Sequence, residues 1–225
     1  IGAALLFYYT STKDKRVDNQ TPFLGPHESH DTSVKIIKEN KSKVFFEFLG
    51  DNDLISKTAK LICEGNIIGW VQGRLEFGAR ALGNRSILAD PRDPQMKKRV
   101  NMVVKKREGF RPFAPMVTFE DRINYFTPAY EIPYMNQIVK VTEKHKDKLP
   151  AITHTDGSAR IQTVRENFNP KIYKLLKKYQ KITGYPILLN TSFNLKDQTM
   201  VRDTQEAIDT FMNCDMDFLV IDNIF

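Results

Sequence analysis

The residues of this sequence best suited to binding an anion lie in a glycine- and arginine-rich stretch from Gly73 to Leu88. Its three glycines let the backbone bend sharply and approach a ligand closely. Arg80 and Arg85 each carry paired N–H donors that grip a phosphate or carboxylate at two oxygens, a geometry that lysine lacks. Glu76 is placed to orient an arginine. Apolar residues interspersed with these charges indicate a packed segment, and packed arginines need anionic partners. We therefore predict an anion site here rather than a solvated turn.

A second cationic segment runs from Asn101 to Pro115. Lys105 lies within it, and Arg111 lies between two aromatics and two prolines at the entrance to an apolar strand. The prolines hold this backbone rigid, which suits a fixed ligand contact. Four other cations of the region read as the solvated face and end of a helix, where they offset the helix dipole. These are Lys97, Lys98, Arg99 and Lys106.

Two later stretches add candidate ligand contacts. Arg160 opens an alternating strand just after a turn at residues 156–157, a position equally typical of a structural strand-edge arginine and of a ligand contact. His154 precedes that turn, where it can shuttle a proton, although a hydrogen-bonded structural histidine is the stronger interpretation. Asn190 and Ser192 follow a buried apolar strand, the position at which open α/β sheets bind ligands. Their side chains offer neutral donors and acceptors for a planar amide or a phosphate oxygen.

The run from Arg74 to Arg111 carries the whole formal charge excess of the chain. Its eleven cations and four anions account for the net charge of +7, and the remainder balances to zero. Such an excess fits nucleic acid, a membrane surface or a small anionic substrate. Nucleic-acid modules interleave exposed aromatics with a basic face, whereas the aromatics here flank prolines and strand starts. A small anion is therefore the preferred partner, and a nucleic-acid-binding module is the disfavoured alternative.

Several common sites are absent from the sequence. It contains neither a GxxxxGK[ST] phosphate loop nor a GxSxG nucleophile motif. The histidines are scattered, and His27 with His30 reads as a pair of solvated loop residues, so no metal site is predicted in this chain. Cys63 and Cys214 have no CxxC neighbour, which favours a reducing, cytoplasmic setting. The apolar run at residues 1–9 is too short to span a membrane.

Alternating helix and strand patterns surround the candidate residues and predict an α/β fold, a twisted mixed sheet with packed helices. Asn169–Pro170 starts an amphipathic helix that Gly184 ends. The predicted helices span residues 33–39, 56–64, 94–104, 170–183 and 204–213. The predicted strands span residues 43–49, 67–72, 113–118, 137–142, 160–164, 186–189 and 217–221.

The amino-terminal quarter reads as a different unit. Residues 10–33 are polar and contain two prolines and a glycine, which is typical of a linker. The apolar run before them reads as the last buried helix of another domain. We therefore predict that residues 1–54 hold the tail of a preceding domain plus a linker, and that residues 55–225 form the α/β domain. The chain is then a fragment of a longer protein.

Four stretches, in order, resemble the carboxy-terminal domain of the NodU/CmcH O-carbamoyltransferase family. The family's GPRALGxRSIL is matched at residues 78–88, FRPFAP at 110–115, DGxARxQTV at 156–164 and NTSFN at 190–194. Together with the elements between them they cover the chain from about Ser56 onward. Ala79 stands where the family often has proline, which leaves this turn less rigid but removes no ligand.

The resemblance implies a YrdC-like α/β domain that binds ATP, as its Mg²⁺ complex, and condenses it with carbamoyl phosphate to a carbamoyl-adenylate. A preceding actin/sugar-kinase-like domain, which holds the family's metal ion, then passes the carbamoyl group to a hydroxyl of a sugar or natural product. Cations are needed because both substrates are highly anionic. The resemblance assigns catalytic roles to Arg80, Lys105, Arg111, Arg160 and Ser192. It assigns substrate or ATP contacts to these five and to Arg85, His154 and Asn190.

The nearest alternative is a YrdC-like domain that makes threonylcarbamoyl-adenylate for tRNA modification. The stretches at residues 110–115 and 190–194 resemble the carbamoyltransferase pattern instead. A demand for threonine and bicarbonate in place of carbamoyl phosphate would reverse this choice. The expected partners are therefore small molecules and the preceding domain of the same protein, with no membrane and no nucleic acid.

Overall fold

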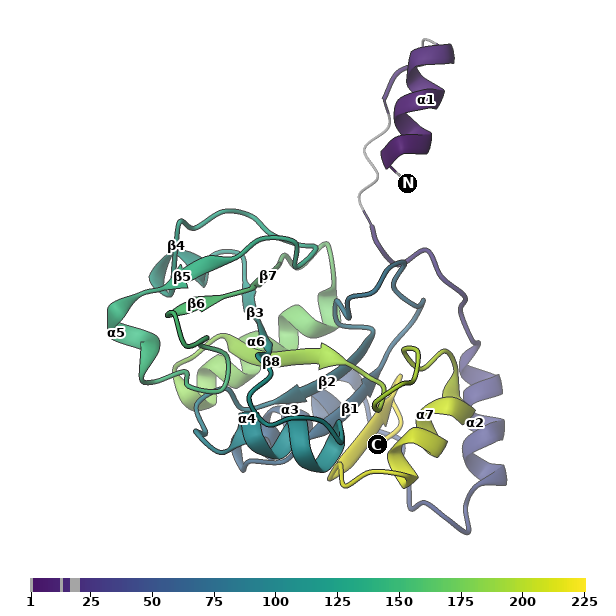
Figure 1. Cartoon of the computed structure of the whole chain (residues 1–225). Coiled ribbons are helices and arrows are strands. Elements are labelled where there is room, and N and C mark those ends of the chain that lie inside the picture. Colours follow the sequence, from purple (N-terminus) through teal and green to yellow (C-terminus); the bar gives the residue numbers. More distant parts are fainter. Residues whose placement is uncertain (1, 13, 17–20) are drawn as a thin grey trace.

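The computed structural model describes residues 2–12, 14–16 and 21–225. It confirms the predicted α/β fold, since a six-stranded mixed sheet is packed between helices (Figure 1). The first helix, α1 (Gly2–Thr12), has no buried residue, so its packing in a preceding domain stays a prediction. The predicted start of this helix at Ile1 lies outside the described residues, as do residues 13 and 17–20 of the predicted linker.

The central sheet has the strand order β7-β3-β8-β2-β1-β9. β8 pairs antiparallel with both β2 and β3, whereas β3 runs parallel to β7 and β1 runs parallel to β9. Its strands are β1 (Ile68–Val71), β2 (Arg85–Ala89), β3 (Ala114–Thr118), β7 (Gln162–Val164), β8 (Ile187–Ser192) and β9 (Phe218–Ile221). A smaller sheet joins β4 (Phe126–Thr127), β5 (Val139–Val141) and β6 (Ser158–Ala159) in that order.

Helices cover both faces of the central sheet and so enclose two apolar clusters. On one face, α3 (Asp51–Cys63) and α6 (Pro170–Thr183) pack over Trp70, Leu88 and Leu188. On the other face lie the short α4 (Met96–Arg99), the π-helix η1 (Val100–Val104), α7 (Thr204–Met212) and the smaller sheet. The remaining helices are α2 (His30–Glu39), α5 (Glu143–Lys146) and the 3₁₀-helix η2 (Asp121–Asn124).

The structure corrects three of the predicted elements. The stretch around Arg85 is not only a glycine turn, because it continues into β2, a strand buried throughout. The predicted strand over residues 43–49 forms only a single bridge, Phe48 to Ile224, and Phe45 in its middle is fully exposed. The predicted helix over residues 94–104 is shorter at its start and changes from α4 to the π-helix at Val100.

The predicted domain boundary between residues 54 and 55 falls inside α3. The segment before α3 is also attached to the α/β body: Gly25 N–H donates to the carbonyl of Leu75 at 2.9 Å, and Glu28 accepts from the Thr204 amide at 3.0 Å. α2 lies beside α7 (Figure 1). Residues from about Pro22 onward therefore contact the α/β body, and the predicted division of the chain into domains stays a prediction.

Candidate functional site

The four predicted stretches meet at one end of the central sheet. The loop at residues 73–84 leads into β2, and residues 190–192 end β8, its antiparallel neighbour. The segments at residues 105–113 and 160–161 enter the parallel strands β3 and β7. Together they surround a cavity of about 250 Å³, here called the arginine pocket. Its lining comprises Ala79, Arg80, Ala81, Arg107, Arg111, Pro112, Phe113, Ala114, Met135, Arg160, Asn190, Thr191 and Ser192.

Five of the eight predicted contacts line this pocket: Arg80, Arg111, Arg160, Asn190 and Ser192. Lys105, Arg85 and His154 do not. A fourth arginine, Arg107, does line it, although no pattern in the sequence separates Arg107 from its basic neighbours. Four guanidinium groups from three distant segments therefore gather around one cavity.

Side chains of neighbouring strands hold the loop that carries Arg80. Its next three carbonyls, at residues 81, 82 and 83, each accept one hydrogen bond from the sheet. The donors are Asn190 Nδ2 at 2.9 Å, Gln162 Nε2 at 2.8 Å and Trp70 Nε1 at 3.1 Å. Because all three donors are buried, the backbone directly after Arg80 is fixed relative to β1, β7 and β8.

Glu76 closes the same loop from inside. Its Oε1 accepts the backbone N–H groups of Leu82, Asn84 and Arg85 at 2.8, 2.7 and 3.1 Å. The side chain is 3% exposed, so these bonds replace those that water would make. The sequence predicted that Glu76 orients an arginine. In the structure, its hydrogen bonds shape the backbone of the loop that presents Arg80.

Arg85, predicted to bind the anion, is placed differently. Arg85 is 2% exposed, and its Nη atoms donate to the carbonyls of Gln72, Gly73, Asn84 and Arg202 at 2.8–3.2 Å, whereas its buried Nε has no partner in the described part of the chain. Burial lowers the pKa of Arg85, and the nearby carboxylate of Glu76 opposes that shift. This arginine therefore joins the strand end to two loops, and the geometry favours a structural role over a ligand contact.

The inner wall of the pocket carries two buried polar atoms without a hydrogen-bond partner in the described part of the chain. One is the acceptor Oδ1 of Asn190, and the other is the donor Nε of Arg160. Asn190 is 1% exposed, and its Nδ2 is already engaged by Ala81 and by Gln162 Oε1. Buried polar groups are normally satisfied. An unpaired acceptor and an unpaired donor on two residues that line one pocket therefore match a ligand that offers both an N–H group and an oxygen.

Lys105 contacts the pocket wall from behind. Its Nζ is enclosed by Ser192 O and Oγ at 2.5 and 3.3 Å and by Asn194 Oδ1 and O at 2.5 and 2.9 Å. Burial, followed by the charge of Arg107, lowers the pKa of Lys105 to about 7. Since Ser192 lines the pocket and Lys105 does not, the geometry has Lys105 position Ser192.

His154 belongs to the turn before β6 and β7. Its Nδ1 lies 3.2 Å from Ser158 Oγ, and its backbone N–H donates to the carbonyl of Ser158 at 2.8 Å. Burial lowers the pKa of His154, Asp156 opposes this effect, and Lys97 and Arg160 add to it. These contacts fit the hydrogen-bonded structural histidine that the sequence favoured.

Like charges crowd the arginine pocket. Burial lowers the pKa of Arg160, and the charge of Arg80 lowers it further. The pKa of Arg107 falls for the same two reasons, with Arg111 as the neighbouring cation. The pocket is thus a concentration of positive charge suited to anionic oxygens.

The described residues contain no cluster of three metal-binding side chains, and none of their helices is long and apolar enough to cross a membrane.

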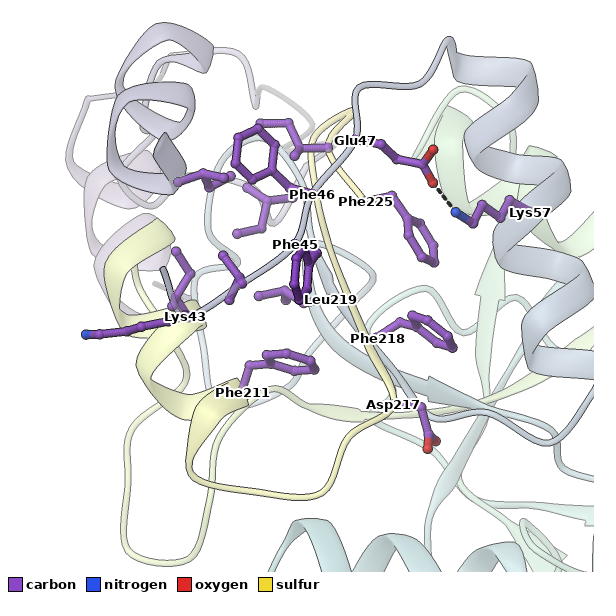
Figure 2. A pocket seen from close by; sticks show the side chains of 15 residues that line it. Lys43, Phe45, Phe46, Glu47, Lys57, Phe211, Asp217, Phe218, Leu219 and Phe225 are labelled. Atoms are coloured by element: carbon purple, nitrogen blue, oxygen red, sulfur yellow. Dashed lines mark hydrogen bonds and ion pairs between the residues drawn. The ribbon is translucent and has the colours of Figure 1, made fainter. Parts of the chain in front are cut away.

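A larger cavity, of about 530 Å³, lies between α7, β9 and residues 43–47, here called the aromatic cavity. Figure 2 shows that Phe45, Phe46, Phe211, Phe218 and Phe225 surround it, with the ion pair of Glu47 and Lys57 near its edge. None of the predicted site residues lines it. Its lining is mostly apolar, and Lys57 there is already paired with Glu47, so the smaller arginine pocket is the candidate site.

Comparison with known proteins matches most of this chain to one family. Residues 59–225 match the family "Carbamoyltransferase C-terminus". The nodulation protein NolNO of Sinorhizobium fredii is 50% identical over 173 residues, 76% of this chain and 25% of that protein. Protein MJ1058 of Methanocaldococcus jannaschii is 44% identical over 207 residues, 91% and 34% of the two chains. The 3'-hydroxymethylcephem-O-carbamoyltransferase of Amycolatopsis lactamdurans is 40% identical over 144 residues, 64% and 27%.

This chain thus spans about a quarter to a third of the length of these relatives. Two solved structures share its fold, in agreement with the predicted α/β architecture. T. kodakarensis HypF has a TM-score of 0.52 at 16% identity over 77% of this chain and 20% of HypF. Full-length HypF in its phosphate- and nucleotide-bound form has a TM-score of 0.50 at 18% identity, covering 80% and 22%. The family match and the four motifs gathered at one sheet end together show that this chain belongs to the carbamoyltransferase C-terminus family.

Proposed function

We propose that this chain is the carboxy-terminal part of an ATP-dependent O-carbamoyltransferase and that its arginine pocket binds carbamoyl phosphate and ATP. In net balance, carbamoyl phosphate, ATP and water give carbamoyl-adenylate, phosphate and pyrophosphate. A preceding domain of the longer protein, with its own metal ion, would then pass the carbamoyl group to a hydroxyl acceptor such as a sugar. Mg²⁺ would enter with ATP as part of the substrate.

The observation that carries this proposal is the convergence of four arginines on one small cavity beside neutral amide and hydroxyl groups. Cations of this kind offset the repulsion between two anionic substrates and stabilise charge on phosphoryl oxygens. The unpaired Oδ1 of Asn190 suits the N–H of a carbamoyl group, which a phosphate lacks. The named activity of the Amycolatopsis relative and the nucleotide in the HypF structure support the same assignment.

Two further parts of the proposal concern the cellular location of the protein and its binding partners. A cytoplasmic location is supported by Cys63 and Cys214, which are both free thiols. Nucleic acid remains a disfavoured partner because the four arginines gather around one small cavity of about 250 Å³ rather than along a basic stripe.

Isothermal titration calorimetry tests the proposal directly. The chain is expected to bind carbamoyl phosphate and ATP, and Arg160→Gln should weaken carbamoyl phosphate binding about 10-fold or more, since bonds to charged groups contribute about 1.5–3 kcal/mol. The matched control is Arg165→Gln, because Arg165 lies five residues away in a surface ion pair with Glu131. A folded sample that gives no heat with either ligand would overturn the proposal, and heat only with threonine and bicarbonate would favour the tRNA-modification alternative.

A further inference from the structure

The predicted linker includes residues 22–26, here called the linker segment, and in the structure this segment lies against the loop that carries Arg80. Three backbone hydrogen bonds join the two segments. They run from Gly25 N–H to the carbonyl of Leu75 at 2.9 Å, from Leu75 N–H to the carbonyl of Pro26 at 3.0 Å, and from Phe77 N–H to the carbonyl of Pro22 at 2.7 Å. The linker segment is therefore paired with the loop rather than only connecting two parts of the chain.

The two backbones approach each other so closely at Gly25 that no side chain fits between them. A Cβ atom at Gly25 would lie 2.8 Å from both the carbonyl oxygen and the Cβ atom of Leu75. Neither of these atoms can rotate away as the end of a flexible side chain would, so one of the two segments would have to move. The contact therefore requires glycine at this position.

Arg80 lies between two anchored stretches of its loop. After Arg80, the carbonyls of residues 81–83 are held by buried donors of the central sheet. Before it, the backbone hydrogen bonds from residues 75–80 to other segments of the described chain all go to the linker segment. The side chains of residues 77–80 are exposed, so packing does not fix this stretch. The linker segment thus supports the loop on the side that the sheet does not reach.

Phe23 supports a second part of the arginine pocket. Its half-buried side chain packs against Leu82, Ala114 and Met135. Ala114 and Met135 line the pocket, whereas Phe23 itself does not. The ring of Phe168 lies 5.6 Å from that of Phe23, centre to centre, and holds it in place. Phe23 therefore contacts the apolar wall of the pocket without contacting its interior.

We propose that Phe23 and Gly25 are positioning residues, and that the linker segment gives the arginine pocket its ligand-binding shape by holding the loop of Arg80 and the wall formed by Ala114 and Met135. This inference rests on the proposed function and deepens it, because it assigns the linker a part in ligand binding. A segment that favours binding is in turn favoured by the ligand. Ligand binding should therefore strengthen the contact between the linker segment and the loop.

Calorimetric titration with carbamoyl phosphate tests the positioning role. Gly25→Ala should weaken binding about 10-fold, within the usual range of coupling between sites. The matched control is Gly50→Ala, because a Cβ atom at Gly50 meets nothing closer than Asp53 Oδ2 at 3.9 Å and the φ of −66° suits any residue. Its affinity should stay within about twofold of the wild type.

Substitution of Phe23 tests the second contact. Phe23→Ala removes the packing against the pocket wall and should also weaken binding about 10-fold, whereas Phe23→Leu keeps most of that packing and should restore most of the affinity. Thermal unfolding establishes that each variant is folded at the temperature of the titration. A merely structural contact would lower the Tm and leave the affinity of the folded chain unchanged.

Hydrogen exchange measured by mass spectrometry shows whether the effect passes through the contact. In the wild type, saturating carbamoyl phosphate should slow exchange in peptides that cover residues 22–26 and 73–84. In Gly25→Ala without ligand, the amides of Leu75 and Phe77 should exchange faster than in the wild type, while those of α3 should not change. Equal exchange of the two loop amides in both proteins would contradict the proposed contact.

The outcomes separate this inference from the proposed function. If the wild type binds carbamoyl phosphate and folded Gly25→Ala and Phe23→Ala bind it equally well, the positioning role is wrong and the proposed function stands. If the folded wild type does not bind carbamoyl phosphate, the proposed function fails and the positioning role fails with it. If Gly25→Ala does not fold, Phe23→Ala decides, because an unchanged affinity there would overturn the inference.

Discussion

Two neighbouring regions of this molecule use arginine in opposite ways. Around Arg85, four backbone carbonyls accept from the Nη atoms and the carboxylate of Glu76 lies close by, so the protein itself supplies the partners. Both Arg85 and Arg160 have a buried Nε without a partner, but in the described part of the chain no acceptor serves the Nη atoms of Arg160, and the charge of another arginine, Arg80, acts on it. This difference indicates that an arginine whose Nη groups are paired within the protein supports the fold, whereas an arginine whose Nη groups are unpaired is available to a ligand.

The largest effect that tests this comparison is expected at Arg85. Arg85→Met removes the cation but leaves Glu76 and four carbonyls buried, and breaking a buried charged network from one side typically costs about 3–5 kcal/mol. The free energy of unfolding, measured by urea denaturation, should fall by an amount of that order. Ligand affinity, measured under conditions in which the variant is still folded, should change far less.

Arg74→Met is the matched control for this experiment. Arg74 lies in the same loop but is exposed and makes a single hydrogen bond, to the carbonyl of Leu24. Its loss should alter the free energy of unfolding by no more than about 0.5 kcal/mol. Wild-type stability together with a loss of carbamoyl phosphate binding in Arg85→Met would contradict the structural role of Arg85, since Arg85 would then belong with the pocket arginines.

The difference between Arg85 and the pocket arginines also shows how much of the site could be predicted from the sequence. The α/β fold, most helices and five pocket residues followed from periodicity, caps and motif chemistry. Arg80 and Arg85 looked equivalent because spacing does not reveal which side of a loop each guanidinium occupies. Their positions depend on hydrogen-bond partners elsewhere in the chain. These are Gln162 and Asn190 for the loop of Arg80, and Gly73 and Arg202 for Arg85.

Arg107 escaped prediction for a different reason. The helix before it changes to a π-helix, in which Lys105 N–H bonds to the carbonyl of Val100 five residues earlier. The helix ends at Val104, and Lys106 after it adopts a positive φ of 51°. Arg107 therefore lies beyond the helix, where no helical periodicity predicts the direction of its side chain, although Lys106 before it lies on the surface and bonds to the carbonyl of Asn213. β2 was missed because a strand that begins with a buried arginine carries no apolar signal at its start.

An intermediate effect on the free energy of unfolding is expected at Lys105, because this cation is enclosed by the protein behind the ligand site. Its folded-state pKa is lowered to about 7 from 10.5. Between these values the unfolded chain holds a proton that the folded chain has released, so stability should rise with pH across that window, by up to about 1 kcal/mol per pH unit. Below pH 7 both states are protonated, and the cost of burying the charge is fully present.

Urea denaturation at pH 6.5, 8 and 9.5 measures this effect. Lys105→Met should remove the rise, so that the stability of the wild type relative to the variant improves with pH over this range. Lys106→Met, at the exposed neighbouring position, is the control and should follow the wild-type curve. Parallel curves for the wild type and Lys105→Met would mean that Lys105 keeps its charge in the folded state.

The smallest effect is expected for a substitution in the aromatic cavity, a region that contains none of the arginines compared above. Phe45 lines that cavity but is fully exposed, so Phe45→Ser removes little buried surface. The free energy of unfolding should stay within about 0.5 kcal/mol of the wild type. Affinities for carbamoyl phosphate and ATP should stay within twofold, because no charged group of the arginine pocket is disturbed. A loss of either affinity in calorimetry would show that this ligand binds in the aromatic cavity. The pairing of an arginine within the protein would then no longer tell which arginines stabilise the fold and which bind the ligand.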